Sequence, residues 1–253
     1  MQQCQMQIVE NVRIAKDTYR MSLASFEMDL KRFTPGCFVH IKIGDGAYLL
    51  RRPISLYEID FEKGHVRIIY KVLGKGTEIL SGLGIGEELN ILGPLGSGFP
   101  IQDESKSVLL VGGGVGVPPL YELGKRLQAK GVKVTSVLGF QDAESIYALE
   151  EFGKLGEVLV STMDGSFGQK GTIMDILNSD TIDFDTLYSC GPKGMLRALD
   201  IKYQGSKKGY LSFEERMACG IGACYGCMLE TKEGLKRVCK DGPVFALGEV
   251  SYE

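Results

Sequence analysis

The sequence predicts a multidomain protein that joins an antiparallel β-barrel, a doubly wound α/β domain with a parallel sheet, and a small cysteine-bearing domain. Short alternating segments rich in β-branched residues recur over residues 5–91. After a glycine-rich link at residues 93–98, apolar strands alternate with amphipathic helices. From about residue 208 the chain is rich in cysteine and has too few apolar side chains for a core of its own. We therefore expect three domains, at residues 1–99, 100–207 and 208–253.

The first domain has strands at the spacing of a barrel. Residues 38–43 and 66–72 alternate as half-buried strands do, and turn-forming sequences at 35–36, 44–46 and 74–76 separate the strand segments. Residues 77–83 instead carry the apolar pattern of a short helix. The segment is therefore expected to be a barrel of antiparallel strands with one helical insertion.

The second domain alternates strand and helix. We expect strands at residues 108–111, 134–140, 158–160 and 186–189, and helices at residues 120–130, 145–152 and 173–177. Gly131 would end the first of these helices. Such alternation is typical of a parallel, doubly wound sheet.

The third domain carries the most specific motif of the chain, a C-x4-C-x2-C-x11-C spacing. Its four cysteines are Cys219, Cys224, Cys227 and Cys239. Plant-type [2Fe–2S] ferredoxins use the C-x4-C-x2-C frame with a distant fourth cysteine. The loop glycines, Gly220, Gly222 and Gly226, would allow positive φ and bring backbone N–H groups up to the sulfurs. The spacing therefore predicts a [2Fe–2S] cluster held by these four cysteines, which would also stabilise the small domain.

Two other uses of the cysteines stay open. A structural zinc site takes four thiolates, but zinc ribbons favour two separate CxxC knuckles, and only Cys224 and Cys227 have that spacing. Disulfides are disfavoured because the composition is that of an intracellular protein. Outside the motif, Cys4, Cys37 and Cys190 remain, and Cys37 is expected to be a small buried side chain.

A second motif, Arg51-Arg52-Pro53-Ile54-Ser55, lies at the start of a predicted barrel strand. A guanidinium can grip a pyrophosphate with two hydrogen bonds, so this motif is suited to a dinucleotide flavin. Gly76 and Thr77, at the head of the short helix, would offer N–H groups and a hydroxyl to the same phosphates. Without this context, a strand start with two solvated arginines would explain the motif equally well.

A third motif is the glycine-rich turn formed by Gly112, Gly113, Gly114 and Gly116. It directly follows a predicted strand and precedes a helix that begins at Pro118-Pro119, where helical N–H groups are not needed. Bare backbone at a helix N-terminus is what a phosphate-binding turn requires. The turn is not a strict GxGxxG, and no acidic residue is placed about twenty residues on to hold a ribose.

Composition excludes other classes. The 253 residues carry a net charge of −3, with 44% hydrophobic residues and no lysine or arginine cluster, so nucleic acid is not an expected partner. No window approaches 18 uninterrupted apolar residues, and the first residues lack a basic region followed by an apolar one. We expect a cytoplasmic protein with no membrane contact. The only histidines, His40 and His65, fall in predicted strands and favour structural use, which disfavours hydrolysis.

Taken in order along the chain, these motifs resemble the ferredoxin–NADP reductase superfamily and, within it, the electron-transfer subunits of NAD-dependent (type B) dihydroorotate dehydrogenase. The resemblance covers essentially the whole chain, and its most specific part is residues 215–227. It implies that the barrel domain binds FAD, the α/β domain binds NAD and the last domain binds [2Fe–2S]. FAD would lie against Arg52, Pro53, Ile54, Ser55, Ile69, Tyr70, Lys71, Gly76 and Thr77, and NAD would face Gly112, Gly113, Gly114, Gly116, Cys190, Gly191 and Pro192.

The resemblance also implies a function in pyrimidine (UMP) biosynthesis. Electrons would pass from the FMN of a separate catalytic subunit through [2Fe–2S] and FAD to NAD+, and the complex would be a heterotetramer. No residue of this chain would then be catalytic in dihydroorotate oxidation, since the chain cannot also house a (β/α)8 barrel of about 250 residues. Two alternatives stay open: a related subunit that links NAD(P)H to ferredoxin or to sulfur compounds, and a non-enzymatic iron–sulfur sensor.

Overall fold

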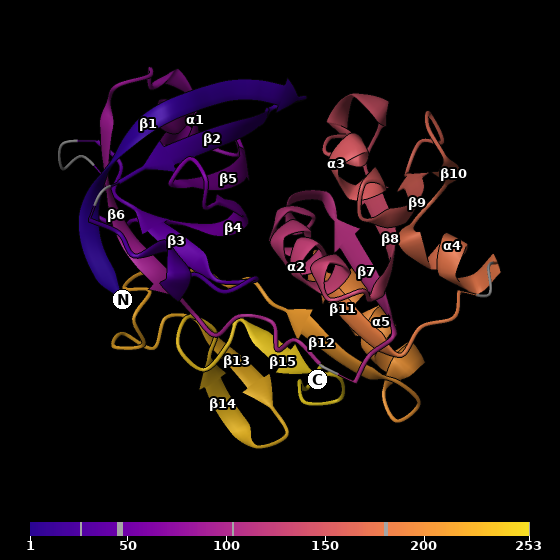
Figure 1. Ribbon diagram of the computed structural model, residues 1–253. Helices are drawn as coiled ribbons and strands as arrows, with labels where there is room; N and C mark the ends of the chain where they lie inside the picture. The colour runs from indigo at the N-terminus through magenta and orange to yellow at the C-terminus, as the bar shows by residue number, and fades with distance from the viewer. Residues whose placement is uncertain (26, 45–47, 103, 180–181, 253) are drawn as a thin grey trace.

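The computed structural model describes residues 1–25, 27–44, 48–102, 104–179 and 182–252. The barrel and the α/β domain lie side by side, and the C-terminal segment, drawn in yellow, lies beneath both (Figure 1). The predicted fold class is confirmed, because an antiparallel barrel, an α/β sheet and a cysteine-bearing C-terminal region follow one another along the chain.

The barrel is closed, with strand order β1-β2-β5-β4-β3-β6. Its elements are β1 (Gln2–Ala15), β2 (Thr18–Ala24), β3 (Phe38–Ile41), β4 (Arg52–Asp60), β5 (His65–Lys71), α1 (Lys75–Gly82) and β6 (Glu88–Leu95), with a 3-10 turn at Leu30–Arg32. The long strand β1 closes the barrel because its first part pairs with β6 and its second part with β2. Alternate side chains of these strands, such as Met6, Ile8 and Met21, fill the interior.

The α/β domain is built on a seven-stranded sheet with the order β10-β9-β8-β7-β11-β12-β15. Its strands are β7 (Ser107–Gly113), β8 (Lys133–Phe140), β9 (Gly156–Thr162), β10 (Gln169–Lys170), β11 (Thr186–Cys190), β12 (Lys208–Ser212) and β15 (Val244–Ala246). Its helices are α2 (Pro118–Ala129), α3 (Leu149–Gly153), α4 (Ile173–Ser179) and α5 (Lys193–Tyr203), with 3-10 turns at Gly114–Gly116 and Ala143–Ser145. The sheet is parallel except at β15.

The helix expected at residues 145–152 differs in the structure. Its first part is a 3-10 turn that the Asp142 side chain caps at the backbone N–H of Ser145, 2.9 Å away. Ala148 then takes a φ of +60°, which stops any helix, and α3 starts only at Leu149. The apolar run Ile146–Tyr147 packs against the core next to this bend, so the apolar pattern is real but belongs to a loop. Helix α5 had not been predicted.

The C-terminal region is not a separate body. Strands β12 and β15 extend the large sheet, and only β13 (Met228–Thr231) and β14 (Gly234–Arg237) form a hairpin of their own. Cys227, Val238 and Cys239 share one core with side chains of the barrel and the sheet. Sharing a core with the other domains agrees with the small number of apolar residues in the C-terminal segment. The boundaries at residues 99/100 and 207/208 stay predictions.

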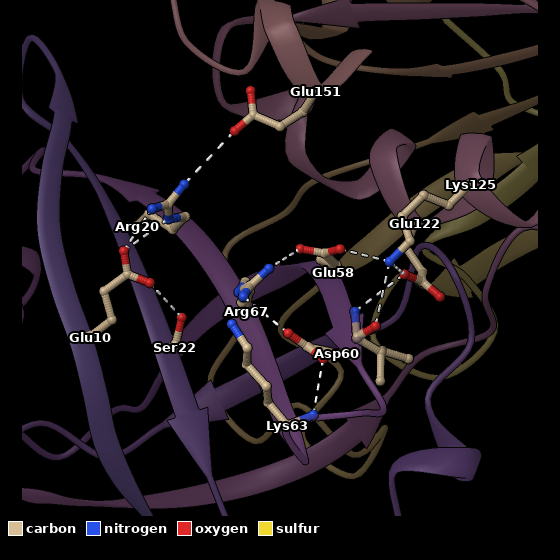
Figure 2. A network of polar contacts seen from close by, with 11 residues as sticks. Glu10, Arg20, Ser22, Glu58, Asp60, Lys63, Arg67, Glu122, Lys125 and Glu151 are labelled. Carbon is tan, nitrogen blue, oxygen red and sulfur yellow. Dashed lines mark hydrogen bonds and ion pairs between the residues drawn. The ribbon is translucent and has the colours of Figure 1, made fainter. Parts of the chain in front are cut away.

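Barrel and α/β domain are joined by packed rings and by a buried carboxylate. Tyr57 of β4 stacks on Tyr121 of α2, with ring centroids 4.8 Å apart. Glu122, whose side chain is 3% exposed, accepts a hydrogen bond from the backbone N–H of Ile59 at 3.2 Å and pairs with Lys125 and Arg126 at 3.5 and 2.8 Å. Lys125 also reaches Glu58 of β4 (Figure 2). This network fixes the angle between the two domains.

We expect Glu122→Ala to lower the free energy of unfolding by about 3 kcal/mol, because it leaves the buried N–H of Ile59 without its acceptor and removes one carboxylate partner from Lys125 and Arg126. Denaturant unfolding followed by circular dichroism measures this loss. Glu144→Ala is the matched control, since Glu144 pairs with Lys16 at the surface and its side chain is 77% exposed. Equal stability of the two variants would contradict the role given to Glu122.

Candidate functional site

The four cysteines of the motif come together around one loop and one turn. Backbone N–H groups of Ile221, Ala223 and Cys224 lie 3.5, 3.3 and 3.4 Å from the Sγ atom of Cys219. The N–H of Gly222 lies 3.1 Å from the Sγ atom of Cys239. Beyond β14, the N–H of Cys239 lies 3.4 Å from the Sγ atom of Cys227. The sulfurs thus sit in a cradle of backbone donors, as the sequence predicted.

The loop needs glycine at two positions. Gly220 and Gly222 take φ values of +70° and +83°. A Cβ on Gly222 would lie 2.5 Å from the Lys240 side chain, and one on Gly220 would lie 2.5 Å from Nδ1 of His40. Gly226, also expected to take positive φ, does not. Tyr225 takes it instead, at +57°, with its ring over the Arg237 guanidinium.

The thiols differ in their electrostatic environment. Although partial burial acts against it, the backbone N–H groups lower the pKa of Cys219 to about 6. Burial and the neighbouring Cys227 raise the pKa of Cys239 to about 12. Among the described residues, no three side chains of His, Cys, Asp or Glu converge as ligands of a single ion. Cys224 lies near Cys219, and Cys227 lies near Cys239.

A cavity of about 240 Å³ opens at the barrel edge. Eight of the nine residues predicted to contact FAD line it: Arg52, Pro53, Ile54, Ser55, Ile69, Tyr70, Lys71 and Thr77. The ninth, Gly76, lies under the Arg52 guanidinium, where a Cβ would approach Nε to 2.6 Å. Arg52 points to the cavity while its neighbour Arg51 turns away to the Asn90 side chain and to the backbone carbonyls of Asn90 and His40.

A larger cavity, of about 580 Å³, lies at the carboxyl ends of the parallel strands. Of the residues predicted to face NAD, Gly113, Gly114 and Pro192 line it. The other four, Gly112, Gly116, Cys190 and Gly191, lie directly behind them. A Cβ on Gly116 would be 2.3 Å from the Cys190 carbonyl oxygen, so the glycine turn and the Cys190-Gly191-Pro192 turn touch only because this residue is glycine.

The two cavities meet. Lys71, at the end of β5, and Val115, in the glycine turn, line both of them. A ligand in the barrel cavity and one in the sheet cavity would therefore touch at this point. This contact joins two motifs that lie about forty residues apart in the sequence.

Comparison with known proteins gives the family. Residues 214–251 match the iron–sulfur cluster binding domain of dihydroorotate dehydrogenase B. The whole chain is 48% identical to the electron transfer subunit of dihydroorotate dehydrogenase B (NAD(+)) from Bacillus cereus (strain G9842), with 99% of both chains covered. The chain belongs to this family of electron transfer subunits. A relative of the same name from Bacillus anthracis (strain CDC 684 / NRRL 3495) is also 48% identical over 99% of both chains.

Solved structures agree with the family assignment. The chain superposes with a TM-score of 0.89 on an NADH-dependent reduced ferredoxin-NADP oxidoreductase, at 32% identity, covering 98% of this chain and 90% of that one. An Amycolatopsis cytochrome P450 reductase gives a TM-score of 0.68 at 22% identity, covering 78% and 64%, and shows the fold alone. The chain is therefore an oxidoreductase subunit, and its family and fold support the predicted cofactors FAD, [2Fe–2S] and NAD. No helix of the described residues is long and apolar enough to cross a membrane.

The residues present fit these cofactors. The barrel cavity places the Arg52 guanidinium and the hydroxyls of Ser55 and Thr77 beside apolar side chains, as a flavin dinucleotide needs, and the sheet cavity opens onto bare glycine backbone. The cysteine loop aims five N–H groups at thiol sulfurs. Each predicted cofactor thus has a site with matching chemistry.

Sequence reasoning missed the part of each cavity that other segments supply. In the barrel cavity these residues are Phe38, Leu73, Val115, Ser212, Phe213, Glu214, Glu215, Met217 and Pro243. Burial among the surrounding protein atoms raises the pKa of the Glu214 carboxyl, although the residue is classed as exposed by its surface area. In the sheet cavity, the additional lining residues Gly139, Phe140, Gln141, Ser161 and Met163 could have been found from a general rule, because ligands of such sheets bind at the carboxyl ends of the parallel strands.

Proposed function

We propose that this chain transfers electrons between NAD, bound in the sheet cavity, and a partner subunit that approaches the cysteine loop, through FAD in the barrel cavity and a [2Fe–2S] cluster on the four cysteines. The observation that carries this proposal is the continuity of the three sites. The two cavities share Lys71 and Val115, and the barrel cavity is lined by Met217, two residues before Cys219.

The cofactors supply the redox chemistry: nicotinamide exchanges two electrons as hydride, a [2Fe–2S] cluster exchanges one, and a flavin can do either. The chain supplies binding and orientation. Arg52 would hold the pyrophosphate of FAD, and Thr77, at the start of α1, would add a hydroxyl. The backbone at Gly113 and Gly114 would let NAD approach, and the contact at Lys71 and Val115 would bring its nicotinamide against the flavin.

The finer proposal concerns the partner. By its family, this chain would serve the FMN-bearing catalytic subunit of a dihydroorotate dehydrogenase in the cytoplasm, and symmetric pairing of that subunit would give a heterotetramer. Dihydroorotate oxidation would then take place on the partner.

We expect the isolated, cofactor-loaded chain to oxidise NADH with an artificial acceptor such as ferricyanide and to show no activity on dihydroorotate. Spectrophotometric assays at 340 nm, and detection of orotate by its own absorbance, check both halves. The expected result follows because the two cavities described above suit FAD and NAD, and dihydroorotate oxidation is assigned to the partner. Orotate production from dihydroorotate and NAD+ by this chain alone would refute the division of labour.

The partner would contact the exposed side of the cysteine loop, where Ile221 and Tyr225 are 42% and 62% exposed. We expect Ile221→Lys or Tyr225→Lys to weaken complex formation about tenfold or more, because a charge would be buried in an apolar contact. Size-exclusion chromatography with the catalytic subunit measures this. The control is Ile201→Lys, because Ile201 is also exposed, at 61%, but lies on helix α5 and not on the cysteine loop. Equal weakening by the control would contradict the proposed surface.

A second candidate function has one specific observation in its favour, the 32% identity to an NADH-dependent reduced ferredoxin-NADP oxidoreductase. Under this alternative the cysteine loop would serve a small iron–sulfur protein. Reduction of ferredoxin by NADH through this chain, at a rate exceeding transfer to the catalytic subunit, would favour it over the first proposal.

A further inference from the structure

His40 of β3 is fully buried, and neither of its ring nitrogens has a hydrogen-bond partner of normal geometry among the described residues. Burying a polar ring without partners costs free energy, so a ring in this position calls for an explanation. The other histidine, His65 on β5, is partly exposed. The sequence indicated only a structural role for both.

The ring of His40 lies between two of the proposed sites. On one side, Gly220 of the cysteine loop is so close that a Cβ would stand 2.5 Å from Nδ1 and 2.8 Å from Cε1. On the other side, Phe38 meets the ring edge-to-face, with centroids 6.3 Å apart at 89°. Phe38 also lines the barrel cavity. His40 therefore contacts both the cysteine loop and a residue of the flavin-cavity wall.

The backbone of His40 is held in place by Arg51, whose guanidinium donates to the His40 carbonyl oxygen at 3.3 Å. Burial and the charge of Arg51 lower the pKa of the His40 ring to about 4. The Cys219 backbone raises this pKa, which is the effect of a carbonyl that faces a ring N–H. The contact between the His40 ring and the Cys219 backbone falls short of full hydrogen-bond geometry. A histidine ring carries an N–H donor whether it is neutral or protonated.

From this placement we propose that His40 is a positioning residue of the iron–sulfur site. In the cluster-loaded protein one ring N–H would donate to the backbone carbonyl of Cys219, and the ring, which packs against Gly220, would seat the Cys219-Gly220 peptide against the barrel wall. The loop that follows then keeps the N–H groups of Ile221, Ala223 and Cys224 directed at the Cys219 sulfur. Together with Phe38, the ring sets the separation between the cluster and the flavin cavity. This inference rests on the proposed function of the four cysteines.

The test compares His40→Leu, which keeps the volume and removes both nitrogens, with His40→Asn, whose amide can place a donor near the position of Nδ1. His65→Leu is the control at the other histidine. Each protein is purified with its cofactors, and three quantities are measured: the rate of cluster loss to an iron chelator, the electron paramagnetic resonance spectrum of the reduced cluster, and the FAD content. Stopped-flow absorbance also follows NADH-dependent reduction of the cluster.

We expect His40→Leu to lose its cluster about tenfold faster, the factor expected for one buried hydrogen bond, and to show a changed resonance spectrum at unchanged FAD content. His40→Asn should restore most of the wild-type behaviour, and His65→Leu should match the wild type. If the His40 side chain only fills space, His40→Leu should keep its cluster as long as His40→Asn or longer. That result would overturn the inference.

A second measurement keeps the inference testable if the leucine variant does not fold. In wild-type protein labelled with 15N-histidine, pulsed resonance of the reduced cluster should detect one histidine nitrogen, and His65→Leu should leave that signal unchanged. Absence of any histidine coupling would overturn the inference. The proposed function would fail separately, if the wild-type protein showed no [2Fe–2S] signal at all.

Discussion

Cys239→Ser should abolish the visible iron–sulfur absorption of the purified protein, reducing its cluster content about tenfold or more. Its Sγ atom lies at the cluster site, 3.1 Å from the N–H of Gly222, and the residue is 3% exposed. A serine hydroxyl stays protonated at neutral pH and is a poor iron ligand, so the cluster would lose one of its four thiolates. Even partners that only hydrogen-bond to a ligand commonly cost tenfold or more when removed. Absorbance between 300 and 600 nm and iron analysis measure the loss.

Cys37→Ser is the matched control, because Cys37 is equally buried, at 1% exposure, but lies inside the barrel core. Burial raises the pKa of the Cys37 thiol to about 12. Cys37 belongs to the barrel core, whereas Cys227 and Cys239 belong to a different core cluster, so we expect Cys37 to be no ligand. We expect this variant to be less stable but to keep its full cluster, and Cys4→Ser to behave in the same way. A complete [2Fe–2S] signal in Cys239→Ser would show that the fourth ligand is assigned to the wrong residue.

Arg52→Ala should weaken FAD retention about tenfold or more. The guanidinium lines the barrel cavity beside Thr77, and the absence of a Cβ on Gly76 leaves it room. A hydrogen bond to a charged group contributes roughly 1.5–3 kcal/mol, and about 1.4 kcal/mol corresponds to a factor of ten in affinity. Flavin released on dilution, measured by its fluorescence, reports the change. The FAD retention of Arg52→Lys should fall between that of the wild type and that of Arg52→Ala, because lysine keeps the charge but cannot form two parallel hydrogen bonds.

Arg51→Ala separates the two neighbouring arginines. Arg51 lines neither cavity and instead donates to Asn90 and to the His40 backbone, so it links β3 to β6. The variant should keep FAD in the folded protein while lowering the stability of the barrel. If Arg51→Ala released the flavin and Arg52→Ala retained it, the assignment would be off by one residue.

Much of the site was predictable because its signals are local. The C-x4-C-x2-C spacing lies on one loop, and its glycines and backbone donors act over a few residues. The glycine turn after β7 also sits between adjacent elements, so its strand–turn–helix context is legible in the sequence. Strand β4 carries four consecutive residues of the barrel cavity, and the motif that marks them is contiguous.

Other features could not be predicted because they depend on contacts between distant segments. Nothing local marks Phe38 or Met217 as part of the barrel cavity. Phe38 joins it because β3 pairs with β4, and Met217 joins it because the C-terminal segment lies beneath the barrel (Figure 1). The bend that replaces the first half of the helix expected at residues 145–152 has the same cause. Its apolar side chains pack into the core from a bent loop, and an apolar pattern alone does not distinguish this packing from that of a helix.

The sequence by itself determined the order of the three parts, the chemistry of the cluster site and the identity of the residues suited to FAD, because spacing and residue type decide these within single segments. Only the tertiary structure decided that the cofactor cavities meet at Lys71 and Val115, that β12 and β15 complete the large sheet, and that His40 stands between the cysteine loop and the flavin cavity. These relations join residues from about forty to 180 positions apart. They arise from sheet closure and from burial of the C-terminal segment, which local patterns do not encode.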